Sequence, residues 1–177
     1  MSNSVRKLTF SAIYLAIAMI LPFLTGQIQQ IGQMLCPMHL PVLLCGFVCG
    51  WQWGLAVGFI SPILRGAIFG MPPLFPTAVA MAFELAVYGF VSGFLYKKLP
   101  KKKWITYVIL LIAMIAGRLV WGLVQMILAG ITHNEFTGAI FLAGAVTNAI
   151  PGIILQLILV PILVFAMEKA RLMLNDR

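Results

Sequence analysis

The sequence predicts an all-α integral membrane protein in which one transmembrane domain, residues 1–177, contains six helices and both termini are cytoplasmic. Composition is the first observation: 62% of the residues are hydrophobic and 9% are charged, whereas soluble domains average about 45–50% and 25%. The second observation is that the apolar runs reach the ~20 residues that a helix needs to cross a bilayer. The third is that basic residues flank these runs. No segment is long or polar enough for a soluble catalytic domain.

Lysine and arginine residues gather in three clusters, and these clusters set the expected topology. They are Arg6 with Lys7, the lysines of residues 97–103, and Lys169 with Arg171 and Arg177. Positive charge beside membrane helices marks the cytoplasmic side, so the number of helices between successive clusters must be even. The net charge of +8 is therefore assigned to topology and not to a nucleic-acid surface.

Breaks in the apolar pattern place four helices before the central lysines and two after them. The expected ranges are 8–25, 38–50, 54–70, 76–96, 104–131 and 139–168. The first helix is expected to be retained, because its apolar run is longer than that of a signal peptide and no small-residue cleavage site follows it. The polar Gly/Gln segment 26–33 is an expected external loop. The second helix, which is short, begins near Pro41, a favoured first-turn position.

Glycine recurs at every fourth position in the first half of the chain. Gly46, Gly50, Gly54 and Gly58 form one series, and Gly89 and Gly93 form another. Small residues at this spacing let two membrane helices approach closely. The first series crosses an expected turn at 50–54, so only part of it can form one packing face. Helix packing inside the bundle is the favoured interpretation of both series.

Three ionisable side chains, Arg65, Glu84 and Arg118, lie inside segments that are expected to span the membrane. A charge at the bilayer centre costs about 2.5–3.5 kcal/mol on insertion scales, so such residues pair with one another or serve a polar cavity. At 1.5 Å per residue, Arg65 is expected about 8 Å, Glu84 about 12 Å and Arg118 about 20 Å from the outer surface.

Other polar side chains are expected at overlapping depth. Asn148 lies about 15 Å from the outer surface in the last helix, and Trp121 and Gln125 share the helix face of Arg118 at the i, i+3, i+7 spacing. The inner halves of these helices carry few such groups, with Gln156 the main exception. A continuous pore would need polar lining at every level. The pattern therefore predicts a ligand pocket that is open to the outside and closed toward the inside.

The partner of Glu84 decides which charge is left for a ligand. The sequence leaves open whether Glu84 pairs with Arg65, with Arg118 or with the ligand, and Arg65 is favoured because it also lies nearer the outer surface. One arginine then remains without a carboxylate, and arginine is well shaped to hold a planar anion. Arg118 is accordingly expected to hold the polar end of the ligand. The further candidate ligand-binding residues are Glu84, Asn148, Trp121, Gln125, Arg65 and His39.

No catalytic or metal site is expected. Cys36, Met38 and His39 bring together side chains that bind soft ions, but their spacing matches no strong metal-site pattern, and His39 is instead expected to contact the ligand or the external loop. Glu84 is the only deep carboxylate, and no glycine-rich phosphate loop is present. The protein is therefore not expected to be an enzyme or to need a cofactor.

Four segments carry a resemblance to a known family. They are Ala12-Ile13-Tyr14-Leu15-Ala16, the stretches 38–46 and 54–62, and Gly70-Met71-Pro72-Pro73. Together with the six-helix length, these segments resemble the substrate-binding S-components of energy-coupling factor (ECF) vitamin transporters, and the resemblance extends over nearly the whole chain.

The resemblance implies partners, a location and a function. It implies that Ala12 and Ala16 face the coupling helices of a transmembrane T-component, which recruits two ATPases at the bacterial plasma membrane. It also implies that the loop 26–33 acts as a lid and that helices four to six hold the ligand. The implied function is high-affinity binding of a small water-soluble vitamin or precursor for ATP-driven uptake. A spare arginine favours pantothenate, and riboflavin or a pyridoxine-type compound is the alternative.

Two other functions compete with this one. A self-sufficient secondary carrier or channel would need a polar path through the inner half and is commonly built from inverted repeats, and neither feature is evident in the sequence. A non-transport assembly protein would use its glycine and alanine faces for association alone and would bind no ligand.

Overall fold

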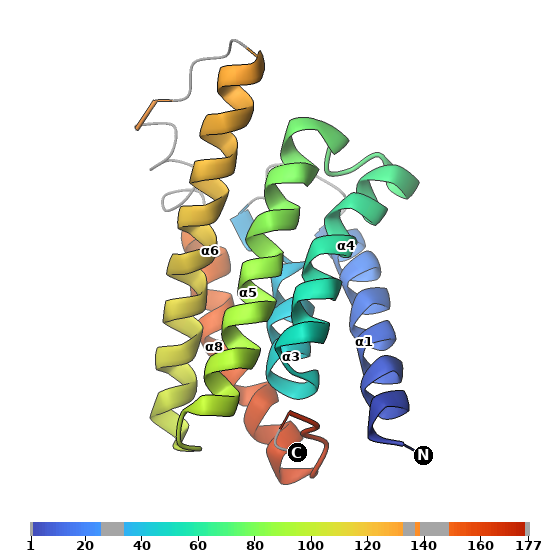
Figure 1. Cartoon of the computed structure of the whole chain (residues 1–177), viewed down its shortest axis with the longest axis vertical. Helices are drawn as coiled ribbons and strands as arrows, with labels where there is room; N and C mark the ends of the chain where they lie inside the picture. Colours follow the sequence, from blue (N-terminus) through green and yellow to red (C-terminus); the bar gives the residue numbers. More distant parts are fainter. Residues whose placement is uncertain (1, 26–33, 133–136, 139–148, 176–177) are drawn as a thin grey trace.

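The computed structural model describes residues 2–25, 34–132, 137–138 and 149–175, and these form a bundle of helices (Figure 1). Within these described ranges lie six α-helices: α1 (Asn3–Ile20), α3 (His39–Cys49), α4 (Trp51–Phe69), α5 (Val79–Lys98), α6 (Lys103–Thr132) and α8 (Ile150–Lys169). Two short helical segments, η1 (Leu21–Thr25) and η2 (Leu74–Ala78), continue α1 and lead into α5. The expected all-helical fold with six helices is confirmed.

Five helical segments within the described ranges are long and apolar enough to cross a membrane, judged by length and composition. They are Asn3–Leu24, Trp51–Phe69, Leu74–Lys98, Lys103–Ile131 and Ile150–Lys169. The second helix in the chain, α3, is shorter, with 11 residues. The start of α1, the α5–α6 connection and the end of α8 all lie at one end of the bundle (Figure 1). We call this end, which carries Lys97 to Lys103 and Lys169, the basic end.

The structure differs from the expected ranges at the turn between α3 and α4. The sequence predicts a turn over 50–54, whereas the chain reverses at Gly50 alone, with φ of +104°. Glycine adopts this conformation without a steric penalty because it has no Cβ, so Trp51 and Trp53 already belong to the first turn of α4. The expected external loop 26–33 and residues 139–148 of the expected last helix lie outside the described residues.

The first helix begins at Asn3, before the expected residue 8, because a capping residue precedes it. The backbone N–H of Val5 donates to Ser2 Oγ at 3.3 Å. Serine at this position satisfies one of the N–H groups that a helix start leaves without a partner. The helix therefore includes Arg6 and Lys7, which places both charges in its first turns at the basic end.

Glycine residues bring α5 against α3 and α4 at close to backbone contact. A Cβ atom at Gly54 would lie 2.6 Å from the carbonyl oxygen of Gly89 and 2.7 Å from the Cα of Gly46, and one at Gly93 would lie 2.7 Å from the Gly46 carbonyl oxygen. These positions confirm that the glycine series packs helices inside the bundle. The close approach also fixes where Glu84, on the same helix as Gly89, stands relative to α3.

The chain returns to the bundle after α8 and packs against its basic end. The N–H of Leu174 donates to the Val48 carbonyl at 2.8 Å, and Asn175 Nδ2 donates to the Gly93 carbonyl at 2.9 Å. Both residues are buried. The C-terminal segment thus ties α3 and α5 together at the contact between Gly46 and Gly93.

Replacing Gly89 with alanine is expected to destabilise the protein by about 1–3 kcal/mol, because the new methyl group would overlap the backbone of Gly54 and backbone cannot rotate away as a side chain can. Equilibrium unfolding in mixed micelles measures the change. Gly130→Ala on α6 is the matched control, since a Cβ there would meet nothing within 4 Å. Equal stability of the two variants would contradict the glycine-mediated contact.

Candidate functional site

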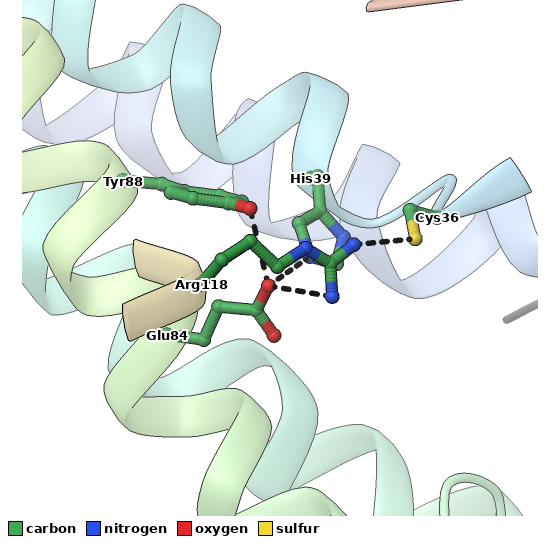
Figure 2. Close-up of polar contacts among 5 residues, drawn as sticks. All are labelled: Cys36, His39, Glu84, Tyr88 and Arg118. Carbon is green, nitrogen blue, oxygen red and sulfur yellow. Dashed lines mark hydrogen bonds and ion pairs between the residues drawn. The ribbon is translucent and has the colours of Figure 1, made fainter. Parts of the chain in front are cut away.

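The carboxylate of Glu84 is the centre of a buried polar cluster. Its side chain is 1% exposed, and its Oε1 receives the hydroxyl of Tyr88 at 3.1 Å. Arg118 Nη1 lies 3.1 Å from the same oxygen. His39 Nε2 is 3.4 Å away, within ion-pair range but without hydrogen-bond geometry. Figure 2 shows these three side chains converging on one carboxylate oxygen.

Three helices supply the members of this cluster. His39 is the first residue of α3, Glu84 and Tyr88 are one turn apart on α5, and Arg118 is near the middle of α6. The i, i+4 spacing puts the carboxylate and the phenol on one face of α5. Gly117, beside Arg118, leaves room for Tyr88, since a Cβ there would overlap the tyrosine ring. The cluster therefore lies where α3, α5 and α6 meet.

Arg118 is the counter-ion of Glu84, which corrects the expected pairing of Glu84 with Arg65. An isolated buried carboxylate is strongly unfavourable, whereas a close arginine offsets much of the cost of removing it from water. The expectation that Arg118 lacks a protein counter-ion is wrong for the same reason. Depth along each helix correctly puts all three charges within the bundle, but it does not say which helix faces they occupy.

Arg65 lies at a different contact, between α4 and the end of α1. Its Nη1 donates to the carbonyl of Met19, and its guanidinium sits 4.8 Å and 5.2 Å from the ring centroids of Phe23 and Phe69. Carbonyls near the end of a helix carry partial negative charge, and aromatic faces attract cations. Arg65 is thus stabilised without an acidic partner among the described residues, and it holds η1 against α4.

Several polar atoms of the cluster make no hydrogen bond. Both ring nitrogens of His39 and the Nε of Arg118 are buried and have no hydrogen-bond partner within the described part of the chain. Buried polar atoms are almost always hydrogen-bonded in folded proteins. The cluster consequently presents the guanidinium donor of Arg118 and the two imidazole nitrogens of His39 to whatever molecule completes it.

Cys36 and Tyr88 belong to the cluster but are missing from the ligand-binding residues that the sequence singles out. Arg118 Nη2 donates to Cys36 Sγ at 3.5 Å, and Cys36 adopts a φ of +47°, which is uncommon outside glycine. This conformation occurs in a segment without a regular pattern, so the sequence carries no signal for it. Tyr88 has a signal: it follows Glu84 by one helical turn.

The remaining candidates lie apart from these contacts or outside the described residues. Trp121 and Gln125 are partly buried on α6, one and two turns from Arg118 toward the end opposite the basic end. Asn148 is outside the described residues. Ala12 and Ala16 are exposed on α1, on the side away from its buried Ser11 and Tyr14. No group of three or more metal-binding side chains occurs within the described ranges.

Glu84→Gln and Arg118→Gln are each expected to destabilise the protein by about 3–5 kcal/mol, because each leaves the other charge buried and uncompensated. The double variant is expected to lose clearly less than the sum of the two, as measured by equilibrium unfolding in mixed micelles. The same cycle with Arg65→Gln in place of Arg118→Gln is expected to be additive within about 0.3–0.5 kcal/mol. Coupling of Glu84 to Arg65 alone would contradict the observed pairing.

Comparison with known proteins places this bundle in one family. The family model described as "ECF transporter, substrate-specific component" matches residues 6–164. Neither a search of curated proteins nor a search of solved structures found a match. The matched range includes at least part of each of the six helices. It also includes the five residues of the buried polar cluster, Cys36, His39, Glu84, Tyr88 and Arg118. The chain belongs to the family of substrate-specific components of ECF transporters.

Proposed function

We propose that the Glu84 cluster, defined as Cys36, His39, Glu84, Tyr88 and Arg118, binds the small molecule that this substrate-specific component recognises. The observation that carries the proposal is a set of buried atoms, His39 Nδ1, His39 Nε2 and Arg118 Nε, that make no hydrogen bond within the described part of the chain. A buried polar atom without a partner is costly, and a polar group on a ligand removes that cost. Membership of this family makes the protein a substrate-binding part of a transporter and not an enzyme.

Charge balance within the cluster favours a ligand without net negative charge. Arg118 and Glu84 neutralise each other at 3.1 Å, so the pair leaves no excess positive charge to hold an anion. The buried atoms without partners in the described structure require an acceptor opposite Arg118 Nε and a donor or an acceptor opposite the ring nitrogens of His39. Neutral heterocyclic vitamins such as riboflavin and pyridoxine carry both kinds of group. We therefore favour this class over pantothenate.

An anionic ligand is the second candidate. Arg118 Nε is buried without a hydrogen-bond partner in the described part of the chain, and a guanidinium donor suits a carboxylate such as that of pantothenate. The two candidates therefore differ in the charge of the ligand that the site accepts.

The side chains beyond Arg118 on α6 extend the proposed site toward the end opposite the basic end. Trp121 offers a flat apolar surface on which a ring can stack, and the Gln125 amide offers both a donor and an acceptor. Both are partly buried on the same helix as Arg118. Asn148 belongs to the proposal on its sequence position alone. These residues would contact the parts of the ligand farthest from Glu84.

Family membership implies association with a T-component and ATPases, and we propose that α1 forms the contact. Ala12 and Ala16 are both exposed one turn apart, and small residues at this spacing let a partner helix approach closely. Ile13 and Ile17 are exposed beside them and would add apolar area. In this proposal two partner ATPases supply the energy for uptake across a bacterial plasma membrane.

The competing functions lack a supporting observation of this kind. A self-sufficient carrier or channel needs polar groups along its whole path, whereas the Glu84 cluster is followed toward the basic end by apolar side chains such as Val48 and Leu110, both fully buried. A pure assembly protein has no use for buried polar atoms without partners in the described structure, such as Arg118 Nε. A self-sufficient carrier or channel would transport its substrate in liposomes without ATPases. A pure assembly protein would bind no ligand.

Purified protein is expected to bind riboflavin or pyridoxine with one molecule per chain and to bind pantothenate at least tenfold more weakly. Isothermal titration calorimetry measures all three, and mass spectrometry of small molecules that copurify with the protein identifies the retained compound. Glu84→Gln should weaken binding by about ten- to a hundredfold, the range for a hydrogen bond to a charged group. Ile112→Val, on the exposed side of α6, is the control. Tight pantothenate binding would favour the anionic candidate instead.

Ala12→Trp is expected to abolish copurification with the T-component and ATPases while leaving ligand affinity unchanged. The large ring would hold a partner helix away from α1 but would not touch the Glu84 cluster, because Ala12 is exposed on α1. Pull-down from membranes and calorimetry of the isolated subunit measure the two effects. Leu8→Met, on an exposed position of the same helix, is the control. Intact assembly in the Ala12→Trp variant would rule out this contact.

A further inference from the structure

Gln156 on α8 is a buried amide whose acceptor is unused. The residue is 2% exposed, and its Oε1 has no hydrogen-bond partner in the described structure. It is also the main polar residue in an otherwise apolar inner half of the expected helices. A buried amide oxygen without a donor weakens the folded state. Its presence therefore calls for a partner that the described part of the chain does not provide.

Helix α8 turns this side chain toward the interior of the bundle. Gly152, Gln156, Val160 and Val164 recur at every fourth position and are all buried, whereas Ile154 and Ile158 are exposed. Helix α8 packs against α3 and α6, which carry His39 and Arg118. Gln156 thus lies on the stripe of α8 that faces two of the three helices that build the Glu84 cluster.

The contact of Gly152 brings this stripe close to the cluster. A Cβ at Gly152 would lie 2.7 Å from the Met34 carbonyl oxygen and 2.9 Å from the Leu35 carbonyl carbon. The next residue in the chain is Cys36, whose sulfur receives Arg118 Nη2 at 3.5 Å. Gln156 is one turn further along the same stripe. The backbone that packs on α8 at Gly152 therefore leads directly into the Glu84 cluster.

Height along the helices agrees with this position. Counted from the helix ends at the basic end, Gln156 lies about 20 Å along α8, Glu84 about 21 Å along α5 and Arg118 about 22 Å along α6. Helix α8 extends further at the basic end than α5 and α6 do (Figure 1). Helical side chains tilt toward the N-terminus of their own helix. For Gln156 this direction leads away from the basic end.

We propose that Gln156 is a further specificity-determining residue, whose Oε1 accepts an N–H or O–H of the ligand at the inner end of the site. This inference rests on the proposed function of the Glu84 cluster. The ligand must then present a donor group at this end of the site. A site that hydrogen-bonds a donor rejects analogues that lack it by large factors. Gln156 thus narrows the ligand class to compounds with a donor at the end that lies nearest to α8.

Gln156→Met provides a test in which stability and binding move in opposite directions. Methionine is of similar length and has no strong hydrogen-bonding group, so it removes the unsatisfied acceptor. The ligand-free variant is expected to unfold at a higher temperature than the wild type, while its affinity for riboflavin or pyridoxine falls about tenfold. Ile158→Met, on the exposed side of α8, is the matched control and is expected to change neither. If Gln156 instead made a purely structural hydrogen bond, the Gln156→Met variant would unfold at a lower temperature than the wild type.

Each outcome separates this inference from the proposed function. A Gln156→Met variant that is less stable than the wild type, or that binds the same compound equally tightly, overturns the role of Gln156. If the role of Gln156 is overturned but the Glu84→Gln variant still binds the same compound more weakly than the wild type, the proposed function stands. If the wild type binds none of riboflavin, pyridoxine and pantothenate and retains no small molecule on purification, the proposed function fails and the inference fails with it.

Discussion

One buried carboxylate, that of Glu84, is the constraint around which this bundle is arranged. A carboxylate in a low-dielectric interior is tolerated only with close partners, and here the partners come from separate parts of the chain. Arg118 supplies the opposite charge at 3.1 Å, Tyr88 a hydroxyl at 3.1 Å, and His39 a ring nitrogen at 3.4 Å. Satisfying Glu84 thereby fixes the relative positions of α3, α5 and α6.

The carboxylate can hold these helices only because glycines let their backbones meet. Gly54 and Gly89 bring α4 and α5 together, Gly46 and Gly93 bring α3 and α5 together, and Gly117 admits the Tyr88 ring beside α6. Apolar side chains alone give weak direction to helix packing in a membrane, where lipid tails are equally apolar. Close glycine contacts and one shared polar centre together specify a single arrangement.

The sequence predicts the elements of this structure better than their mutual orientation. Hydrophobic runs and basic clusters identify six helices, and the cost of buried charge by itself points to Glu84 and Arg118. Position along a helix does not reveal rotation about its axis, and for that reason estimated depth wrongly favours Arg65 as the partner of Glu84. In the structure Arg65 instead meets Met19, Phe23 and Phe69. The role of Cys36 has no sequence signal, because its contact depends on an irregular backbone with φ of +47°.

A cluster whose charges balance internally has a consequence for recognition. Because Arg118 and Glu84 neutralise each other, the fold avoids an isolated buried charge, yet both ring nitrogens of His39 and Arg118 Nε have no hydrogen bond in the described structure. A ligand that supplies the missing partners binds the folded state alone and stabilises it. Selectivity then follows from the pattern of donors and acceptors, since a molecule of matching shape that lacks one of them leaves a buried group unsatisfied. In the proposed function, discrimination among small polar compounds thus arises from the same unsatisfied atoms that weaken the ligand-free fold.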